Sequence, residues 1–299
     1  MISVVIPHYK GKEKLYTNLK HNLPFLKGCE IIVVNDYPEV PLSKEMGELF
    51  PEVTVIENEK NLGFAGAVVV GISTVKNRFV LLLNNDVLLN DDSFQKALNY
   101  FEKDKNLFAV SFRQTEKDGG FVGRNTIQWN KGFFQHAKAD ATQSGINGWA
   151  EGGSMLFDKK KYDKIYGFDD LFSPFYWEDI DLSYRAWKAG YTILFDSKVT
   201  VQHHHESTIA THFHASRIKT IAYRNQFITI WKNISDGRMA WEHLVYLIKN
   251  LIIYPFKGEK EFVSGFWMAA QLARKIMEKR DVQKTTWKKS DREIFEMFK

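Results

Sequence analysis

Three acidic residues, Glu178, Asp179 and Asp181, lie within four positions and directly follow a run of aromatic side chains. The segment from Asp181 onward is typical of a helix that ends at Gly190, and acids in its first turn are stabilised by the helix dipole and the unpaired N–H groups there. Asp181 and Arg185 are four residues apart and can pair on one helical face. Glu178 and Asp179 are left for chemistry, because a carboxylate among aromatic side chains can be tuned as a general base.

The alternative interpretation of this segment is purely structural. Acids that cap the first turn are common in surface helices, so the segment alone does not distinguish a capped helix from a catalytic site. To distinguish a capped surface helix from a catalytic site, the strands and loops that would position such a site have to be considered.

Four short apolar runs occur in the first third of the chain, separated by stretches with a helical pattern. Continuous apolar runs of this length predict buried parallel strands in a layered α/β architecture. The runs are Ser3–Pro7, Ile31–Val34, Val53–Ile56 and Phe79–Leu83.

Two of these runs are followed by polar residues, Asn35-Asp36 in one case and Asn84-Asn85-Asp86 in the other. Either group alone is compatible with ordinary turn chemistry. The carboxyl ends of parallel strands meet at one edge of a sheet, and that edge is where open α/β sheets bind ligands. Both groups at one edge therefore indicate a ligand site.

A series of motifs extends this picture along the chain: Val4–Pro7, Val33–Asp36, Asn61–Gly66, Leu83–Asp86, Glu151–Leu156, Gly167–Asp170, Glu178–Leu182 and His203. In order and spacing, over about residues 1–210, they resemble the family 2 glycosyltransferases of the GT-A fold, most closely the bacterial rhamnosyltransferase-type members. The resemblance implies an α/β fold with a mostly parallel sheet flanked by helices. It implies a catalytic, nucleotide-sugar-binding domain over 1–215 and a basic helical C-terminal extension over 216–299.

The resemblance implies that the donor is a nucleoside diphosphate sugar with uracil or thymine as its base. Pro7 and Tyr9 would line the nucleotide entrance, and Asp36 would accept a hydrogen bond from the N–H of the pyrimidine ring. The donor-binding residues that the resemblance implies are Pro7, Tyr9, Asp36, Asn61, Gly63, Asn84, Asn85 and Gly153.

A divalent metal is implied because Asn84-Asn85-Asp86 stands where the family keeps an Asp-x-Asp motif. Asp86 would bind the metal that bridges the two phosphates. Asn84 replaces the first acid and would contact the ribose or the water shell of the metal, which leaves fewer anionic ligands. Oxygen ligands suit Mg²⁺, and an added imidazole favours Mn²⁺ as a competitor.

The histidine triplet His203-His204-His205 follows a predicted strand at Val199–Val201. Such a triplet can indicate zinc, but adjacent strand residues point to opposite faces, so the three cannot easily chelate one ion. The resemblance instead implies that His203 reaches the metal or the diphosphate, with His204 as second choice. It also implies contacts to the sugar diphosphate from Ser207 and Thr208.

The resemblance assigns the general base of an inverting transfer to Asp179, which would take the proton of the acceptor hydroxyl without a covalent enzyme intermediate. Glu178 would position the acceptor or orient Asp179. The acceptor would be a hydroxyl of a growing glycan or glycolipid. Trp149, Tyr176 and Trp177 would offer aromatic faces to a sugar ring, with core packing as the alternative role.

Two other functions fit part of the sequence. A sugar nucleotidyltransferase needs a Gly-rich phosphate loop with a basic residue after the first strand, whereas the chain has one glycine in residues 7–11. A catalytically inactive nucleotide-sugar-binding or scaffolding domain is favoured by Asn84. The Glu178-Asp179 pair and Asp86 argue against it.

Composition fits a globular intracellular protein. The 299 residues, 44% of them hydrophobic, allow one large domain with an appendage. The single cysteine, Cys29, excludes an internal disulfide, which is typical of a reducing cytoplasm. Met1 runs directly into a strand pattern without a signal peptide, and no apolar stretch reaches the roughly 18–20 residues of a spanning helix. We therefore expect a cytoplasmic location.

Basic charge is concentrated in residues 217–299, which hold 17 Lys/Arg against 9 Asp/Glu and have a helical pattern throughout. Apolar residues over Leu244–Phe256 and from Phe262 to Ile276 alternate with basic ones that include Lys284, Lys288 and Lys289. Such a segment can lie on an anionic membrane, here the inner face of the cell membrane. It can equally pack on the catalytic domain or form a homodimer. Without a recognised nucleic-acid-binding motif, we expect no nucleic-acid partner.

Overall fold

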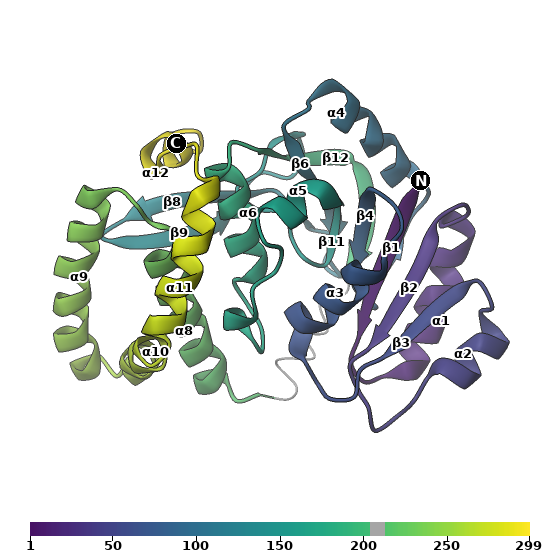
Figure 1. Cartoon of the computed structure of the whole chain (residues 1–299), viewed down its shortest axis with the longest axis horizontal. Helices are drawn as coiled ribbons and strands as arrows, with labels where there is room; N and C mark the ends of the chain where they lie inside the picture. Colours follow the sequence, from purple (N-terminus) through teal and green to yellow (C-terminus); the bar gives the residue numbers. More distant parts are fainter. Residues whose placement is uncertain (204–212) are drawn as a thin grey trace.

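The computed structural model describes residues 1–203 and 213–299, and a ten-stranded sheet forms its centre (Figure 1). The strands are β1 (Ile2–His8), β2 (Glu30–Asn35), β3 (Val53–Glu57), β4 (Phe79–Leu83), β5 (Val87–Leu89), β6 (Leu107–Thr115), β7 (Phe121–Val122), β10 (Gly145–Ile146), β11 (Ser154–Asp158) and β12 (Thr192–His203). They lie in the order β10-β12-β6-β11-β4-β1-β2-β3, with β5 along β12 and β7 along β6. A separate hairpin joins β8 (Asn125–Asn130) and β9 (Phe133–Lys138).

The direction of the strands confirms the predicted mostly parallel α/β sheet. β1 pairs in parallel with β2 and β4, β2 with β3, and β6 with β12. Only β11 among the central strands runs against its neighbours, β4 and β6. All four apolar runs of the N-terminal third form strands, and the predicted strand at 199–201 forms the end of β12.

Helices cover both faces of the sheet because successive side chains of its buried strands point to opposite sides. In β1, Val4 and Ile6 join a core cluster with residues of the first two helices, whereas Val5 joins the cluster that contains the third helix. The helices of this part are α1 (Lys12–Asn22), α2 (Ser43–Leu49), α3 (Gly63–Thr74), α4 (Leu98–Lys103), α5 (Lys159–Lys164) and α6 (Glu178–Lys188). Short 3₁₀ turns occupy Leu23–Phe25, Ser93–Ala97, Asp170–Phe172 and Lys284–Thr286.

The helix α6 begins at Glu178, three residues before the predicted start, and every residue of it except Asp179 is buried. Trp177 adopts the left-handed conformation (φ 74°), and its carbonyl accepts the N–H of Asp181 at 2.8 Å, which closes the first turn early. Glu178 and Asp179 therefore lie inside the first turn. The interpretation of this segment as a capped surface helix is wrong.

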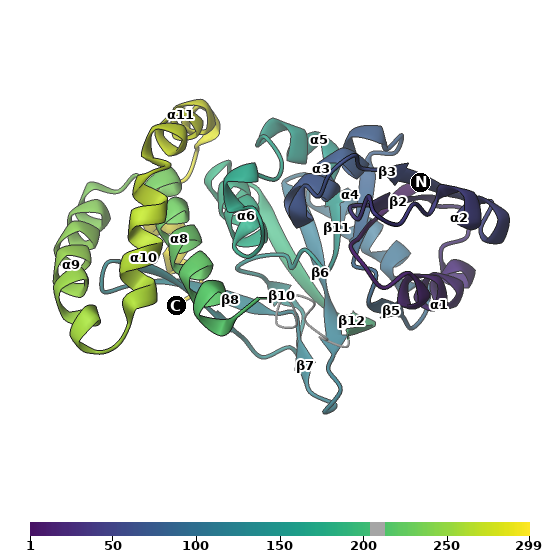
Figure 2. The same ribbon diagram turned by 90° about the horizontal axis from the view of Figure 1, so that it is seen from below.

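The C-terminal segment is helical, as predicted, and lies at the opposite end of the molecule from α1 and α2 (Figures 1 and 2). It consists of α8 (Ala215–Asn233), α9 (Gly237–Phe256), α10 (Lys260–Ala270), α11 (Ala273–Gln283) and α12 (Asp291–Glu296). Phe227, Phe262 and Ile276 of this segment belong to the same core cluster as Phe172 and Trp187 of the sheet-containing part. The two stretches of chain thus share one core. In the described residues, no helix combines the length and the apolarity needed to cross a membrane.

Candidate active site

The carboxyl ends of β1, β2 and β4 bring together the two polar groups that the sequence singled out. The N–H of Asp36 donates to the carbonyl of His8 at 2.8 Å, and Asn85 Nδ2 lies 2.8 Å from His8 Nδ1. Burial lowers the pKa of His8 to about 4, against the opposing charge of Glu57, so the ring is neutral at physiological pH. His8, which the sequence analysis did not select, therefore joins the two groups at one sheet edge.

Asp36 is buried and held in a fixed orientation at the end of β2. Its Oδ1 accepts hydrogen bonds from Asn58 Nδ2 and from the N–H of Leu62, both at 2.8 Å. Burial raises the pKa of this carboxyl, although the two donors oppose the rise. Such a fixed acceptor is suited to the directional N–H of a nucleobase.

An aromatic pair and a cation lie next to this edge. Pro7 is buried within β1, and Tyr9, just beyond the strand, packs edge-to-face on Tyr37 with ring centroids 5.5 Å apart. Lys10 Nζ lies 5.2 Å from the centroid of Tyr9 and 5.1 Å from that of Tyr37. Flat rings beside a positive charge can hold a base and its phosphates.

The loop from Asn61 to Gly63 contacts the loop that leads into α6. Asn61 Oδ1 accepts the N–H of Gly63 at 2.8 Å, and Gly63 has a φ of +72°. A Cβ at Gly63 would lie only 3.2 Å from the carbonyl oxygen of Pro174. Glycine is therefore required here by both its conformation and the close approach of the second loop.

Gly153 contacts two of the predicted ligand-binding residues. A Cβ at this position would lie 3.1 Å from His203 Cε1 and 3.2 Å from Asn84 Nδ2. The carbonyl of Gly153 also accepts the N–H of Asn84 at 2.9 Å. The absence of a side chain thus lets the strand ends of β4 and β12 converge on the turn before β11.

Asp86 and His203 face each other across this convergence. His203 Nε2 lies 3.3 Å from Asp86 Oδ1, and His203 Nδ1 lies 2.7 Å from Gln114 Oε1. Since Gln114 Oε1 can only accept, Nδ1 carries the proton and the lone pair of a neutral ring is on Nε2. Burial would raise the pKa of Asp86, but the positive charges of His203, when its ring is protonated, and of Lys14 outweigh it, so the pKa is lowered.

The geometry of this pair fits a metal ion. Asp86 Oδ1 is buried and forms no hydrogen bond, although it faces the imidazole nitrogen. Two ligands at right angles on one ion, each at about 2.1 Å, lie about 3 Å apart. Within residues 1–203 and 213–299, no three His, Cys, Asp or Glu side chains cluster as a complete metal site. His204, His205, Ser207 and Thr208 lie outside the described residues.

A second set of carboxylates lies on the other side of the Gly152-Gly153 turn. The N–H of Gly152 donates to Asp179 Oδ2 at 3.2 Å, and the N–H of Ile180 donates to Asp179 Oδ1 at 2.8 Å. The pKa of Asp179 is raised to about 6, mainly by burial. The two N–H groups oppose this rise, and the negative charge of Glu151 adds to it. Burial and the charge of Asp179 raise the pKa of Glu178 to about 8.

A network of amides connects the two sides of the turn. Gln114 Nε2 donates to Glu151 Oε2, while Gln114 Oε1 contacts His203. Asn125 Nδ2 donates to Glu151 Oε1 at 3.1 Å. Burial raises the pKa of Glu151 in spite of these bonds. A single glutamine on β6 thus links the Asp86–His203 pair to Glu151, whose charge in turn acts on Asp179.

The turn before α6 is held in an unusual conformation by α8. Tyr176 and Trp177 both have positive φ (71° and 74°), which is rare for bulky residues and costs about 1–3 kcal/mol each. Asn225 Nδ2 donates to the carbonyls of Phe175 at 2.9 Å and of Tyr176 at 2.8 Å. Arg224 Nη2 donates to the carbonyl of Ser173 at 2.5 Å. The C-terminal segment therefore shapes the backbone from which Glu178 and Asp179 project.

The three predicted acceptor-binding aromatics differ in exposure. Trp149 and Trp177 are each 7% exposed and pack edge-to-face on His136, with centroids 5.1 and 5.0 Å from its ring. Both belong to the core cluster. Tyr176 is 38% exposed and, of the three, offers the most ring surface to a ligand.

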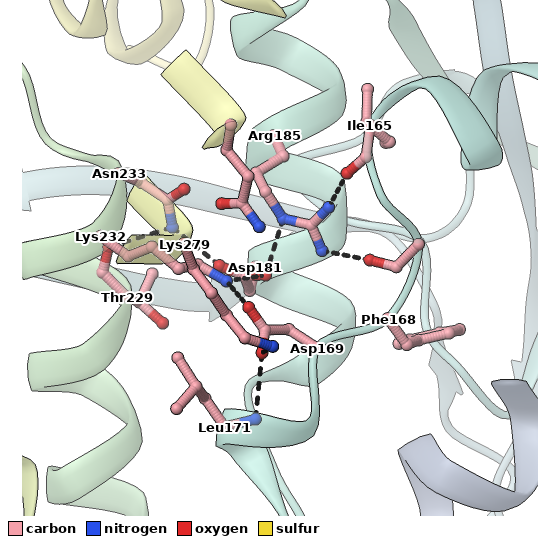
Figure 3. Close-up of polar contacts among 12 residues, drawn as sticks. Ile165, Phe168, Asp169, Leu171, Asp181, Arg185, Thr229, Lys232, Asn233 and Lys279 are labelled. Carbon is pink, nitrogen blue, oxygen red and sulfur yellow. Dashed lines mark hydrogen bonds and ion pairs between the residues drawn. The ribbon is translucent and has the colours of Figure 1, made fainter. Parts of the chain in front are cut away.

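The first turn of α6 is anchored by a buried charge cluster (Figure 3). Asp181 Oδ2 accepts from Arg185 Nε and from Lys232 Nζ, both at 2.8 Å, which confirms the predicted pairing with Arg185. Asp181 Oδ1 accepts from Asn233 Nδ2 at 2.8 Å. Arg185 also donates to the carbonyls of the loop at residues 165 and 167.

Asp169 extends this cluster to α11. Its carboxylate accepts from Lys232 Nζ and from Lys279 Nζ, each at 2.6 Å (Figure 3). Burial alone would raise the pKa of Asp169, but the two ammonium groups hold it well below its usual range. Helices α6, α8 and α11 are therefore tied together by ion pairs, of which those of Lys232 are fully buried and that of Lys279 is partly exposed.

Several residues of this site have no local signal in the sequence. Gln114 lies at the end of a long apolar strand, and its partner His203 is 89 positions away. Glu151 lies in a recognised motif without a role assigned to it. Asn225 lies in the C-terminal extension, beyond the recognised motifs, and only the tertiary structure brings it to the turn before α6.

Comparisons with known proteins show the family to which the chain belongs. The model of glycosyl transferase family 2 matches residues 3–165. The chain is 31% identical over 108 residues to an uncharacterized glycosyltransferase of Haemophilus influenzae, an alignment that covers 36% of each protein. The chain spans only 28–40% of the lengths of the curated relatives it matches.

Solved structures show the same fold at low sequence identity. GalNAc-T7, with UDP, GalNAc and Mn²⁺, has a TM-score of 0.59 at 15% identity over 77% of this chain and 47% of that one. The mannosyltransferase PcManGT of Pyrobaculum calidifontis, in complex with GDP-Man and Mn²⁺, has a TM-score of 0.55 at 12% identity over 95% and 86%. The fold is thus GT-A, and with its family model matched over more than half of the sequence, the chain belongs to glycosyl transferase family 2.

Proposed function

We propose that this protein is an inverting glycosyltransferase that moves a hexosyl or deoxyhexosyl group from a UDP- or dTDP-sugar to a hydroxyl of a glycan or glycolipid. The observation that carries the proposal is the Gly152-Gly153 turn. On one side its N–H binds Asp179, and on the other it contacts His203 and Asn84. A base and a diphosphate site on opposite sides of one turn suit in-line displacement at a sugar carbon placed between them.

Asp179 acts as the general base in this proposal. Its pKa of about 6 leaves it ionised at neutral pH and still basic enough to accept a proton. The acceptor oxygen loses its proton to the carboxylate of Asp179 as it bonds to the anomeric carbon, and the bond from that carbon to the diphosphate breaks. Glu178, with a pKa of about 8, then holds a proton and can donate a hydrogen bond to the acceptor.

Asp86 and His203 would hold a divalent metal, Mn²⁺ or Mg²⁺, with the Asn84 amide available as a neutral oxygen donor. The supporting observations are the unbonded Asp86 Oδ1 and the lone pair of His203 Nε2 that faces it. A bound metal neutralises charge on the leaving diphosphate. The structures of GalNAc-T7 and PcManGT, which contain Mn²⁺, support this assignment.

The donor nucleotide would bind at the edge formed by β1 and β2. Asp36 would face the base, Pro7 and Tyr9 would line the entrance, and Lys10 would lie near the phosphates. GalNAc-T7 was solved with UDP and PcManGT with GDP-Man, so the pyrimidine preference rests on Asp36 alone. Thermal-shift measurements with UDP, dTDP and GDP, each with and without Mn²⁺, test it.

An inactive nucleotide-sugar-binding domain is the second candidate, and the replacement of an acid by Asn84 is the observation that favours it. The two candidates differ in turnover. An enzyme releases free nucleoside diphosphate from its donor, whereas a binding domain leaves the donor intact.

The deciding experiment is Asp179→Asn, because the amide cannot take the acceptor proton. We expect transfer to fall by roughly 10²–10⁴-fold, with donor affinity nearly unchanged. Asp163→Asn is the matched control, since this carboxylate is 54% exposed in a surface pair with Lys159. If Asp179→Asn keeps more than about a tenth of the wild-type turnover, Asp179 is not the general base.

A further inference from the structure

The helix α9 has two apolar faces, although a helix on the surface of a globular protein needs only one. One face packs on the rest of the molecule through His243 and Leu247, and His243 Nδ1 lies 2.7 Å from the carbonyl oxygen of Gly132. The second face points away from the protein. In both views α9 lies at the outer end of the molecule, with α10 beside it on the inner side (Figures 1 and 2).

The outer face of α9 is a continuous apolar stripe. Its members recur every three or four residues along about 22 Å of helix, which places them on one side. Trp241 is 67% exposed, Ile252 61% and Phe256 88%. The outer stripe consists of Trp241, Leu244, Val245, Ile248, Ile252 and Phe256. A contiguous exposed patch of this kind marks a binding surface.

The charges on α9 indicate what covers the outer stripe. Arg238 and Lys249 are exposed and border the stripe by helical position, and Lys257 follows at its end. The only acid of the helix, Glu242, accepts a hydrogen bond from Trp129 Nε1 at 2.9 Å. Two copies of this face would place basic side chains against basic side chains. An anionic lipid surface, in contrast, accepts aromatic and aliphatic side chains and attracts the lysines and arginine beside them.

We propose that the outer stripe of α9 lies on an anionic lipid bilayer, with Trp241, Ile248, Ile252 and Phe256 inserted among the acyl chains and Arg238 and Lys249 at the headgroups. The proposal selects one face within the basic C-terminal segment. Of the apolar residues further along, Phe262 and Ile276 are buried in the core, whereas Trp267, Met277 and Val282 are exposed on α10 and α11 and are not part of the stripe on α9. Lys284 pairs with Asp281 at 2.6 Å, and the N–H of Lys288 binds the carbonyl of Lys188.

The test is binding to vesicles made of equal parts phosphatidylglycerol and phosphatidylcholine, measured by co-sedimentation. The variant Ile248→Gln/Ile252→Gln removes two members of the stripe without adding charge. We expect it to weaken binding by at least about tenfold. Leu49→Gln is the matched control, because Leu49 is 56% exposed on α2 at the opposite end of the molecule. This variant should bind the vesicles as the wild type does.

A second variant, Arg238→Gln/Lys249→Gln, tests the charges. Its loss of binding should shrink as salt is added, because screening removes the same attraction from the wild type. Unchanged melting temperatures would show that these exposed substitutions leave the fold intact. Neither donor nor acceptor is present, so the result does not depend on the proposed transferase activity.

Three results would overturn the proposal. The first is a wild-type protein that does not bind the vesicles. The same holds if the wild type is a dimer instead and the Ile248→Gln/Ile252→Gln substitutions make it a monomer. The second is equal binding by the wild type and that variant. The third is loss of binding only when Lys284, Lys288 and Lys289 are replaced by Gln, which would move the contact to the far end of the C-terminal segment.

Discussion

Replacement of Lys232 by Met tests whether the buried charge cluster holds the catalytic end of α6. The ammonium group of Lys232 is fully buried, 2.6 Å from Asp169 Oδ2 and 2.8 Å from Asp181 Oδ2. Met has a similar shape and no charge, so Lys232→Met leaves both carboxylates buried and short of one partner.

The magnitude follows from the bonds that remain. Removal of one partner from a buried ion pair costs about 3–5 kcal/mol. Asp169 keeps Lys279, and Asp181 keeps Arg185 and Asn233, so we expect the lower end of this range, about 3 kcal/mol. At roughly 2 °C per kcal/mol for a chain of this size, the melting temperature should fall by about 6 °C.

The loss should depend on pH. Without the ammonium group, the pKa of Asp169 in the folded state is higher than in the wild type. The variant then binds more protons than the wild type as the pH falls, so its deficit in unfolding free energy should shrink at acid pH. Asp181 shares the first turn of α6 with Asp179, so turnover should fall more than donor affinity does.

The control is Arg274→Met. Arg274 pairs with Glu278 at 2.8 Å, but its side chain is 92% exposed, so the change should cost under about 1 kcal/mol. Denaturant unfolding at several pH values measures the loss of unfolding free energy in each variant and its dependence on pH. If Lys232→Met costs no more than this control, the cluster does not hold α6 and the reasoning fails.

Three further predictions concern the site itself. In Asp86→Ala, Mn²⁺ should no longer strengthen UDP binding in calorimetry, and equal enhancement in variant and wild type would rule Asp86 out as a ligand. Gly153→Ala should displace the His203 ring, 3.1 Å from the new Cβ, and weaken donor binding by about tenfold, whereas Gly47→Ala, with open space around it, should not. Because the pKa of Glu178 is raised to about 8, the folded state binds more protons than the unfolded state above pH 4.5, and the free energy of unfolding should fall as pH rises towards 8. Glu178→Gln should flatten that slope in denaturant unfolding, and an unchanged slope would contradict the shift.

The strands and their polar exits could be predicted because their signals are local. Continuous apolar runs predicted β1 to β4, and the residues after β2 and β4 predicted which sheet edge holds the site. The pairing of Asp181 with Arg185 was also predictable, since helical geometry fixes the distance between residues four apart. These features depend on near neighbours in the sequence.

The remaining features depend on contacts between distant segments. The early start of α6 follows from the left-handed conformation of Trp177, which α8 stabilises through Asn225. No local pattern indicates that Gln114 orients His203. Helical spacing likewise does not tell Phe262, which is buried, from Trp267, which is 60% exposed, because the two lie in the same amphipathic pattern.

The hydrogen bonds from Asn225 to the carbonyls of Phe175 and Tyr176 determine how far the protein can be truncated. A fragment that ends near residue 215 would retain all the matched motifs and still lack the amide that holds the turn before α6. It would also expose the apolar side chains that pack on Phe227. The shortest fragment able to work therefore extends well past the last recognisable motif, and the family signature marks where the chemistry is encoded rather than how much chain is needed to support it.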